Sequence, residues 1–483
     1  MPLKTHKSPP INLLTIITFF SIIFSKGCNA MNIIIVGCGK VGQKLAAQLC
    51  TEENQNVTII DLNYEVVQTL INKYDIMGVA GNGVHLDTLT EAGIEDADLF
   101  IAVTGSDELN LLACLIAKKA GNCQTIARVR NPEYSKEMQL VHKDLGLALI
   151  INPEQTAADE IARVIKFPAA IKIDRFAKGR VEILKFRIPD GSILENMPLH
   201  NIQSALKVDV LICGVERGDE AFIPRGNFVL RSGDIISILT HPKNVNVLFK
   251  TIGLPPHKVK NTIIVGGGET GYYLAKNLIK SGISVKIIDK DLSRCDKLCQ
   301  LLPKATIINA DGTDSSVLLE EGIKDTDALV ALTNIDEENI LLSLFVKSTS
   351  DAKVVTKINR IDYTSVISTL PLDTIVYPKD ITAERIAHFV RSKANTEGNN
   401  IETMHKMLDG KAEALEFYVG SNSPLSDKAL ENLNLRDDVI VACIHRSGKV
   451  FIPRGKDAIM TGDYVIVVTT KSGMSDITDI LNR

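Results

Sequence analysis

The strongest constraint on how this chain folds is an internal repeat with a period of 229 residues. Three pairs of segments keep this spacing: Gly37-Cys-Gly-Lys-Val-Gly42 with Gly266-Gly-Gly-Glu-Thr-Gly271, Ala92–Thr104 with Glu321–Thr333, and Phe222-Ile-Pro-Arg-Gly226 with Phe451-Ile-Pro-Arg-Gly455. Because three distant blocks keep one register, we interpret the whole chain as a tandem duplication.

Each half alternates short apolar, β-branched runs with helical stretches, which is typical of a parallel sheet with crossover helices. The expected strands are Asn32–Val36, Val57–Ile60, Leu99–Val103 and Thr125–Val129, then Thr262–Val265, Val285–Ile288, Leu329–Leu332 and Val354–Ile358. Helices over Glu154–Ile165 and Ile381–Val390 leave these sheets. The expected fold class is α/β, with two Rossmann-like parallel-sheet nucleotide-binding domains that are each followed by a small α+β domain.

The repeat also sets the expected domain bounds. We expect an extension at residues 1–30, Rossmann domains at 31–150 and 260–378, and small C-terminal domains at 170–254 and 401–483. The first small domain offers strand-like runs at Val181–Ile188, Asp209–Val215 and Asp234–Leu239. Its turn Ser232-Gly-Asp234 recurs as Thr461-Gly-Asp463.

Both glycine loops have the context that a dinucleotide site requires. Each follows an apolar strand, opens a helical stretch (Gln43–Cys50; Tyr272–Lys280) and precedes a strand that ends in an acid, Asp61 or Asp289. Asp61 lies 19 residues after the third glycine of its loop, and Asp289 lies 18 residues after that of its own. In dinucleotide-binding sites the acid usually follows the glycine motif by about 20 residues. The alternative is that the glycines serve only the packing of helix on strand.

The chemistry of such a site explains these residue types. The glycines allow a tight turn and let the pyrophosphate approach the N–H groups at the helix N-terminus. A carboxylate at the end of the second strand can accept hydrogen bonds from ribose hydroxyls and would repel a 2′-phosphate. NAD(H) is therefore favoured over NADP(H), although Lys290 beside the second acid weakens this preference.

Further loop residues fall at the carboxyl edge of each expected sheet, where open parallel sheets bind ligands. Ala80–His85 and Ala310–Asp314 are candidates for adenine contacts, and His85 is either such a contact or simply exposed. Two dipeptides, Thr104-Gly105 and Thr333-Asn334, follow the expected strands Leu99–Val103 and Leu329–Leu332. Ser106 with Asp107 and Glu108, and Asn334 with Glu337, are interpreted as helix N-caps with acids in the first turn.

Composition excludes several other classes. With a net charge of −4 the chain has no overall basic field, so we expect no nucleic-acid partner. Its nine cysteines include no CxxC pair and indicate reduced thiols. Cys295 and Cys299 stand one helical turn apart, but no second pair accompanies them at ligand spacing, so no metal site is expected.

The first thirty residues contain one apolar run, Ile11–Phe24, of 14 residues. It resembles a signal-peptide core and is short for a membrane span of about 20 residues. Met31 directly precedes the first expected strand, so our interpretation is that translation starts there and that the upstream stretch is an over-extended reading frame. A membrane anchor and a cleaved export signal are the alternatives.

These motifs, in this order and duplicated, resemble the TrkA family, the peripheral nucleotide-binding components of bacterial Trk potassium uptake systems. Each domain pair resembles an RCK (KTN) domain followed by an RCK-C domain. The resemblance extends from Met31 to Arg483. It includes Glu95-Asp-Ala-Asp98, Ser106-Asp-Glu-Leu-Asn110 and Ala127-Arg-Val-Arg130.

The resemblance implies a regulator that assembles as a homo-oligomeric ring on the cytoplasmic face of the inner membrane. There it would bind NAD(H), with ADP or ATP as further candidates, and gate a membrane potassium-translocating subunit of the TrkH or TrkG type. Nucleotide contacts are implied for Gly37, Cys38, Gly39, Lys40, Val41, Gly42, Asp61, Thr104, Gly105 and Arg128 in the first half, and for Gly266, Gly267, Gly268, Glu269, Thr270, Gly271, Asp289, Thr333 and Asn334 in the second.

Arg128 matches a position that is expected to meet phosphate, and an unpaired surface arginine is the alternative. Its counterpart Lys357 keeps the charge but not the planar fork of arginine, which leaves the nucleotide of the second site open.

The competing function is that of an NAD-dependent oxidoreductase, since the same loop serves hydride transfer. Such an enzyme needs an acid or base brought over the nicotinamide by a second domain. The histidines are scattered without a repeated partner. We therefore expect a sensor with no catalytic residues.

Overall fold

The computed structural model describes residues 30–50, 55–131, 134, 146–167, 170–176, 181–254, 259–360, 364–367, 369–394, 401–421, 423–471, 473–474 and 476–482. The apolar run Ile11–Phe24 lies outside these residues. The chain divides into two compact units, residues 1–127 with 142–149 and residues 128–141 with 150–483.

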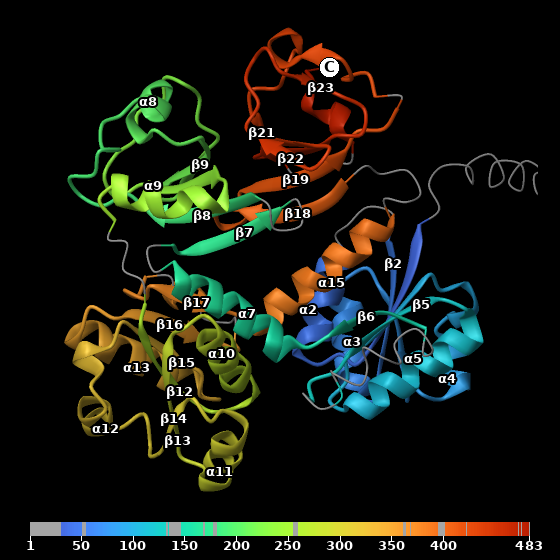
Figure 1. The fold of residues 1–483 in the computed structure, drawn as a ribbon. Helices are drawn as coiled ribbons and strands as arrows, with labels where there is room; N and C mark the ends of the chain where they lie inside the picture. Colours follow the sequence, from blue (N-terminus) through green and yellow to red (C-terminus); the bar gives the residue numbers. More distant parts are fainter. Residues whose placement is uncertain are drawn as a thin grey trace, which may run out of the picture. The chain divides into compact units, whose positions relative to one another are not determined.

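The first Rossmann sheet has the strand order β3-β2-β1-β4-β5-β6 (Figure 1). Its strands are β1 (Met31–Val36), β2 (Gln55–Asp61), β3 (Met77–Ala80), β4 (Leu99–Ala102), β5 (Gln124–Arg128) and β6 (Leu147–Ile151), and its helices are α2 (Lys40–Leu49), α3 (Tyr64–Lys73), α4 (Leu86–Glu91) and α5 (Asp107–Gly121). β1 pairs in parallel with both β2 and β4. The side chains of Ile33, Ile34 and Ile35 are all buried, as expected for a central strand covered on both faces.

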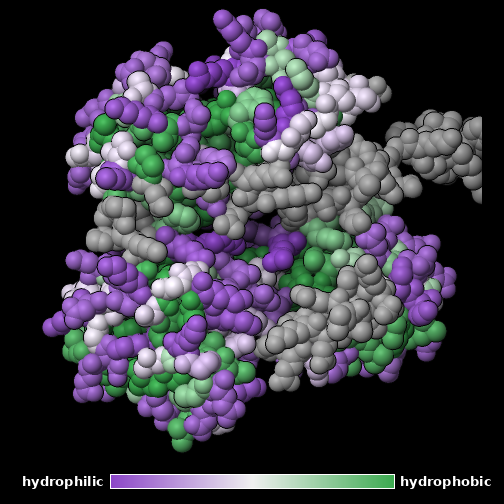
Figure 2. Space-filling model, in the orientation of Figure 1, coloured by the Kyte–Doolittle hydropathy of each residue, from purple (hydrophilic) through white to green (hydrophobic). Residues whose placement is uncertain are grey.

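The second Rossmann sheet repeats this order as β14-β13-β12-β15-β16-β17. Its strands are β12 (Asn261–Val265), β13 (Ser284–Asp289), β14 (Thr306–Asn309), β15 (Ala328–Ala331), β16 (Lys353–Lys357) and β17 (Thr374–Val376), and its helices are α10 (Glu269–Lys280), α11 (Leu292–Leu301), α12 (Ser315–Glu320), α13 (Asp336–Thr349) and α14 (Thr364–Ile367). In Figure 2, hydrophilic residues cover most of the visible face of this domain, and hydrophobic residues form scattered patches.

Each Rossmann sheet is followed by a small antiparallel sheet. The first has the order β10-β9-β11-β8-β7, with β7 (Lys172–Phe176), β8 (Val181–Arg187), β9 (Val210–Arg217), β10 (Glu220–Phe222), β11 (Ile235–Thr240) and helices α8 (Ile202–Leu206) and α9 (Val245–Thr251). The second has the order β18-β19-β24-β21-β22, with β18 (Ile401–Met407), β19 (Ala412–Tyr418), β21 (Val439–Arg446), β22 (Lys449–Phe451) and β24 (Tyr464–Thr469), beside a short pair of β20 (Lys428–Ala429) and β23 (Ala458–Ile459).

The two small sheets share one hydrophobic core. Phe176, Ile183 and Cys213 from the first pack in the same cluster as Ala414 and Ile466 from the second. Packing of two apolar sheet faces is the usual way in which such layers bury their inner surfaces. The repeated small domains therefore pack on each other within one chain.

Two long helices follow the Rossmann sheets, α7 (Pro153–Lys166) and α15 (Pro378–Ala394). α7 packs against α10 and α15 (Figure 1). Ile161 and Ile165 of α7 are fully buried in a core that also contains Leu274 and Leu278 of α10. Although α7 follows the first sheet in the sequence, its apolar face covers the second Rossmann domain.

The expected α/β class and the repeat are confirmed. All eight strands that we expected in the two Rossmann domains are present, within two residues at each end. The sequence did not indicate the sixth strands β6 and β17. The helices after the glycine loops begin at Lys40 and Glu269, three residues before the expected starts, because Gly39 and Gly268 are the N-caps.

Candidate functional site

The two glycine loops have the same backbone geometry. Gly37 and Gly266 have φ angles of 95° and 107°, in the region that favours glycine. A Cβ added at Gly42 would lie 2.0 Å from the carbonyl oxygen of Gly37, and one at Gly271 would lie 2.4 Å from that of Gly266. The first and third glycines are therefore required by the backbone itself.

The middle glycine of each loop faces open space instead. A Cβ at Gly39 or Gly268 would meet no atom within 4 Å. Both are N-caps in an extended conformation, and glycine has no side chain with which to cap the first-turn N–H groups. Those donors and the positive end of the helix dipole are suited to an anion.

The acid at the end of the second strand is tied to the loop in both halves. Asp61 Oδ2 accepts from the backbone N–H of Cys38 at 2.6 Å, and its Oδ1 accepts from that of Asn63 at 2.9 Å. Burial, and then the nearby Asp61 carboxylate, raise the pKa of the Cys38 thiol to about 12. A carboxylate has about four lone-pair sites, so each acid keeps acceptor capacity for ribose hydroxyls.

In the second half, the glycine loop and its acid line a pocket of about 640 Å³. This volume is within the range of roughly 300 to 1,000 Å³ that is usual for ligand sites. We call it the second pocket. Its lining includes eight of the nine residues expected in that half: Gly266, Gly268, Glu269, Thr270, Gly271, Asp289, Thr333 and Asn334. The ninth, Gly267, lies behind it, where a Cβ would meet Leu298 at 2.6 Å. Asp311, Gly312 and Thr313 also line the pocket, as expected for that loop.

In the first half, the expected residues gather around the same turn. A Cβ at Gly37 would lie 2.8 Å from the Cα of Thr104, and Cys38 is bound to Asp61. Lys40 and Val41 form the first turn of α2, which also contains Gly42. Gly105 follows Thr104 and leaves open space beside its own backbone.

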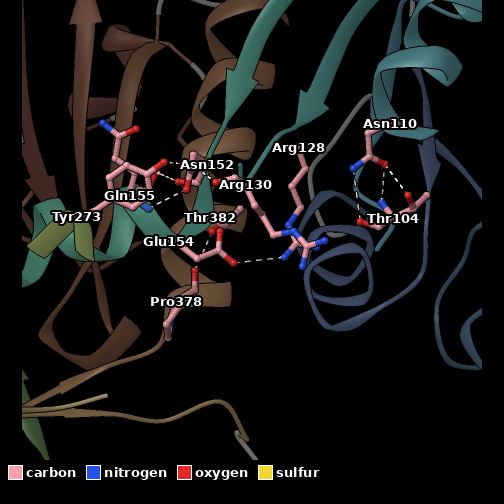
Figure 3. A network of polar contacts seen from close by, with 11 residues as sticks. Thr104, Asn110, Arg128, Arg130, Asn152, Glu154, Gln155, Tyr273, Pro378 and Thr382 are labelled. Atoms are coloured by element: carbon pink, nitrogen blue, oxygen red, sulfur yellow. Dashed lines mark hydrogen bonds and ion pairs between the residues drawn. The ribbon is translucent and has the colours of Figure 1, made fainter. Parts of the chain in front are cut away.

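A buried asparagine fixes the end of the fourth strand in each half. Asn110 Oδ1 accepts from both the N–H and the hydroxyl of Thr104, at 2.8 and 2.7 Å (Figure 3). In the second half, Asn339 Oδ1 accepts from the Thr333 N–H at 2.9 Å, and Asn339 Nδ2 donates to the Lys357 carbonyl at 3.0 Å. Asn110 ends the motif Ser106–Asn110 of the family resemblance, but the sequence indicated this role for neither asparagine.

The expected helix caps are right in one half and wrong in the other. Ser106 caps α5, accepting from the N–H of Leu109, and its hydroxyl donates to Glu108 at 2.7 Å. Asn334 is not the N-cap of α13, which begins at Asp336 after Ile335. Asp336 instead accepts from the N–H groups of Asn359 and Arg360 beyond β16, which sets the helix start.

Arg128 and Lys357 end the equivalent strands β5 and β16. Arg128 Nη2 lies 3.6 Å from Glu154 Oε1, and the two side chains are 16% and 23% exposed, so the alternative of an unpaired surface arginine is wrong (Figure 3). Lys357 is buried, lines the second pocket and donates to the Leu332 carbonyl at 3.0 Å. Burial lowers the pKa of Lys357, and Asp336 and Glu154 partly offset this effect.

The sequence interpretation missed Arg294. Its Nε donates to the carbonyl of Gly267 at 2.6 Å, and its Nη1 bonds Glu269 at 3.0 Å. It thus lies across the outer side of the glycine loop and lines the second pocket. The sequence offered a signal for Arg294. An arginine stands five residues after Asp289, whereas the corresponding position in the first half, five residues after Asp61, is Val66.

The remaining candidates have ordinary surroundings. His85 is the exposed N-cap of α4. Cys295 is buried with its thiol toward the Asp289 carbonyl at 3.4 Å, whereas Cys299 is exposed. Over the described residues, no group of three or more His, Cys, Asp and Glu side chains could hold a metal ion. No helix in the described part of the chain is long and apolar enough to cross a membrane.

The second pocket fits a dinucleotide by three observations. The middle glycine of the loop, Gly268, faces open space, where a Cβ would meet no protein atom within 4 Å. The N-terminus of α10 opens into the pocket, and the Asp289 carboxylate lines it. These groups would hold a pyrophosphate and a ribose.

The fold and the loops define a protein with two Rossmann nucleotide domains, each followed by a small C-terminal domain. The sequence model of the TrkA-N domain family matches residues 33–153 and 262–378. The sequence model of the TrkA-C domain family matches residues 183–253 and 414–482. The chain belongs to the TrkA family.

Relatives of full length support this membership. The Trk system potassium uptake protein TrkA homolog of Archaeoglobus fulgidus is 33% identical over 450 residues, covering 93% of this chain and 100% of the relative. The Trk system potassium uptake protein TrkA of Halomonas elongata is 31% identical, covering 92% and 98%. These relatives are named for potassium uptake, and the chain is not an enzyme, which rules out the oxidoreductase alternative.

Solved structures share the fold. The GsuK channel has a TM-score of 0.61 at 16% identity, covering 94% of this chain and 81% of that one. The GsuK RCK domain has a TM-score of 0.59 at 17% identity, covering 92% and 93%. At this identity the likeness shows the tandem RCK architecture alone.

Proposed function

We propose that this chain is the regulatory, nucleotide-binding peripheral subunit of a Trk-type potassium uptake system. It binds NAD(H), with ADP and ATP as further ligands, at the expected residues of both halves. The domain bounds are residues 31–150, 170–254, 260–378 and 401–483. The observation that carries the proposal is the duplicated glycine loop with its acid tied to the loop, in a chain of the TrkA family.

The partner is a membrane potassium-translocating subunit of the TrkH or TrkG type. The chain forms a homo-oligomeric ring on the cytoplasmic face of the inner membrane and gates that subunit. A nucleotide that binds two ring conformations unequally shifts their populations, and a ring attached to the channel passes that shift to its gate. The family membership and the fold shared with the GsuK channel support this arrangement, and the GsuK channel has also been solved bound to NAD.

Native mass spectrometry of the purified chain tests the binding and assembly parts of this proposal together. We expect a closed homo-oligomer that carries nucleotide of the mass of NAD(H) or of an adenine nucleotide. A monomer that takes up neither added NADH nor added ADP or ATP would contradict the proposal.

A further inference from the structure

The turn between β18 and β19 holds a leucine in a conformation that leucine rarely adopts. Leu408 has a φ angle of 52°, in the left-handed region that favours glycine. Among the described non-glycine residues with positive φ, it is the one with an apolar side chain. Leu408 is 1% exposed. A bulky residue stays in this conformation only where its surroundings hold it there.

The Leu408 side chain takes the space that a glycine of the first small domain leaves. Gly214 lies on β9, and a Cβ added there would be 2.8 Å from Leu408 Cδ2 and 3.0 Å from Leu408 Cδ1. Gly214 has no positive φ, so its own backbone does not require a glycine. The space over Gly214 is therefore filled by Leu408, which belongs to the core that the two small sheets share.

A polar contact ties the same turn to the first small domain. Lys411 follows the turn, and its Nζ donates to the backbone carbonyl of Asp219, between β9 and β10. The turn itself contacts β9. We call residues 408–411 the latch. It joins the second small domain to the first through one apolar and one polar contact.

The position of the latch in the chain connects it to the second Rossmann domain. β18 follows α15 and contacts it (Figure 1), and the latch is the turn at the other end of β18. α15 in turn packs on α7. A displacement of α15 would therefore act on the latch through a single strand.

We infer that the latch closes the interface between the two small domains under strain, and that its release opens this interface. When the latch is closed, burial of Leu408 over Gly214 holds the backbone in the left-handed region. When it opens, the turn relaxes to an ordinary φ angle, and the relief of strain offsets part of the lost burial. The paired small domains thus have a closed and an open conformation, and a ligand that binds one of them better shifts the balance. The latch does not depend on the proposed nucleotide binding.

The interface contains its own reporters, because Cys213 and Cys443 are fully buried in the shared core. The test is labelling of the full chain with N-ethylmaleimide, followed at each cysteine by peptide mass spectrometry. Cys443 is the readout, since it is not next to the substituted glycine. Gly214→Val fills the space of Leu408 and should speed the labelling of Cys443 by about tenfold or more, as expected for an overpacked core position.

Two substitutions of Leu408 separate packing from strain. Leu408→Ala and Leu408→Gly both remove the side chain, but only glycine adopts the left-handed φ angle without strain. Both variants should label Cys443 faster than the parent chain does. Leu408→Ala should label it about fivefold faster than Leu408→Gly, because the alanine variant keeps the strain that opening relieves.

Gly420→Val is the matched control for Gly214→Val. A Cβ at Gly420 meets no atom within 4 Å, so labelling should stay at the parent rate. Cys295, buried in the second Rossmann domain, reports unfolding outside the interface, and its labelling should not change in any variant. Cys299 is exposed and should be labelled at once in every variant, which confirms that the reagent is active.

Three outcomes overturn the inference. Labelling of Cys443 at the parent rate in both Gly214→Val and Leu408→Ala would show that the latch does not hold the interface. Equal labelling in Leu408→Ala and Leu408→Gly would show that opening releases no strain. Labelling of Cys295 as fast as that of Cys443 would show that the variants unfold the chain instead of opening the interface.

Discussion

Asp289 Oδ2 accepts a hydrogen bond of 2.6 Å from the backbone N–H of Gly267, so the acid that is expected to hold the ribose also fixes the middle of the glycine loop. The first half repeats this bond between Asp61 and Cys38, also at 2.6 Å. Hydrogen bonds to a charged acceptor are among the stronger ones in proteins. Each carboxylate therefore has a positioning role toward the loop as well as a binding role toward the ligand.

Replacing either acid should weaken nucleotide binding in its own half. Asp289→Ala removes both the acceptor for ribose hydroxyls and the bond to Gly267, so we expect a loss of about 1 to 3 kcal/mol in NAD(H) binding at the second site. Asp61→Ala should act in the same way on the first. Calorimetry measures both, and Asp296→Ala on the exposed side of α11 is the control. Unchanged affinity in Asp289→Ala would remove that residue from the site.

Bound NADH should remain chemically idle. The residues that line the second pocket include no histidine, tyrosine, serine or cysteine, and its Lys357 donates to the Leu332 carbonyl. Hydride transfer requires an acid or base positioned over the substrate carbonyl. Absorbance at the NADH band, followed with a panel of small aldehydes and ketones, should show no steady oxidation. Turnover that depends on the protein and is lost in Gly268→Asp would contradict this expectation.

A repeated ion pair stabilises the small domains. Arg217 binds Asp234 through two hydrogen bonds of 2.8 Å, and Arg446 binds Asp463 in the same way at 2.8 and 2.7 Å. The Asp234 side chain is 2% exposed. Arg217→Ala leaves this carboxylate buried without its partner and should lower the free energy of unfolding by about 3 kcal/mol.

The exposed pair Arg225–Asp437 is the matched control for this stability measurement. Its side chains are 62% and 94% exposed, and exposed pairs contribute about 0 to 1 kcal/mol. Arg225→Ala should therefore shift denaturant unfolding far less than Arg217→Ala does. Equal shifts in the two variants would show that the buried pair has no special role.

The buried pair Arg217–Asp234 also predicts how the free energy of unfolding depends on pH. Burial alone would raise the pKa of Asp234, but hydrogen bonds from Arg217 and from the Arg231 backbone bring it below the ordinary value of 3.8. A carboxyl whose pKa is lower in the folded state adds stability above its unfolded pKa and loses it as the pH falls through the folded value. The stability difference between the parent chain and Arg217→Ala should thus be full at pH 7 and shrink below about pH 4. Unfolding curves between pH 7 and pH 3 measure it, and a difference that stays constant to pH 3 would contradict the prediction.

The sequence could indicate the glycine loops and their acids because each depends on local spacing. Gly37, Gly42 and Asp61 follow one another within a single strand-helix-strand unit, so a motif suffices to place them. The position of Glu154 depends on which sheet α7 covers. The sequence predicts a helix with an apolar face, but such a face can pack on any apolar surface, so only the folded chain places Glu154 in the second pocket.

The errors have a similar cause. Asn334 has the composition of a helix cap, but Asp336 is needed two residues later to hold the loop after β16, and this contact sets the start of α13. Arg294 reaches back over its own loop, a direction that follows from its bonds to Gly267 and Glu269 and not from its place in the helix. Both depend on contacts between segments that are distant in the sequence.

The most direct test of the proposed regulation is rubidium flux in vesicles that contain the membrane potassium-translocating subunit. Flux is measured with and without this protein, over a range of NADH and ATP concentrations. Gly39→Asp places a carboxylate where the pyrophosphate is expected, and Gly39→Ala is its control, since a Cβ there meets no atom within 4 Å. We predict that the protein makes flux depend on nucleotide, that Gly39→Asp removes part of this dependence, and that Gly39→Ala retains more of it. Flux that is the same with and without the protein, at every NADH and ATP level, would contradict the regulatory assignment.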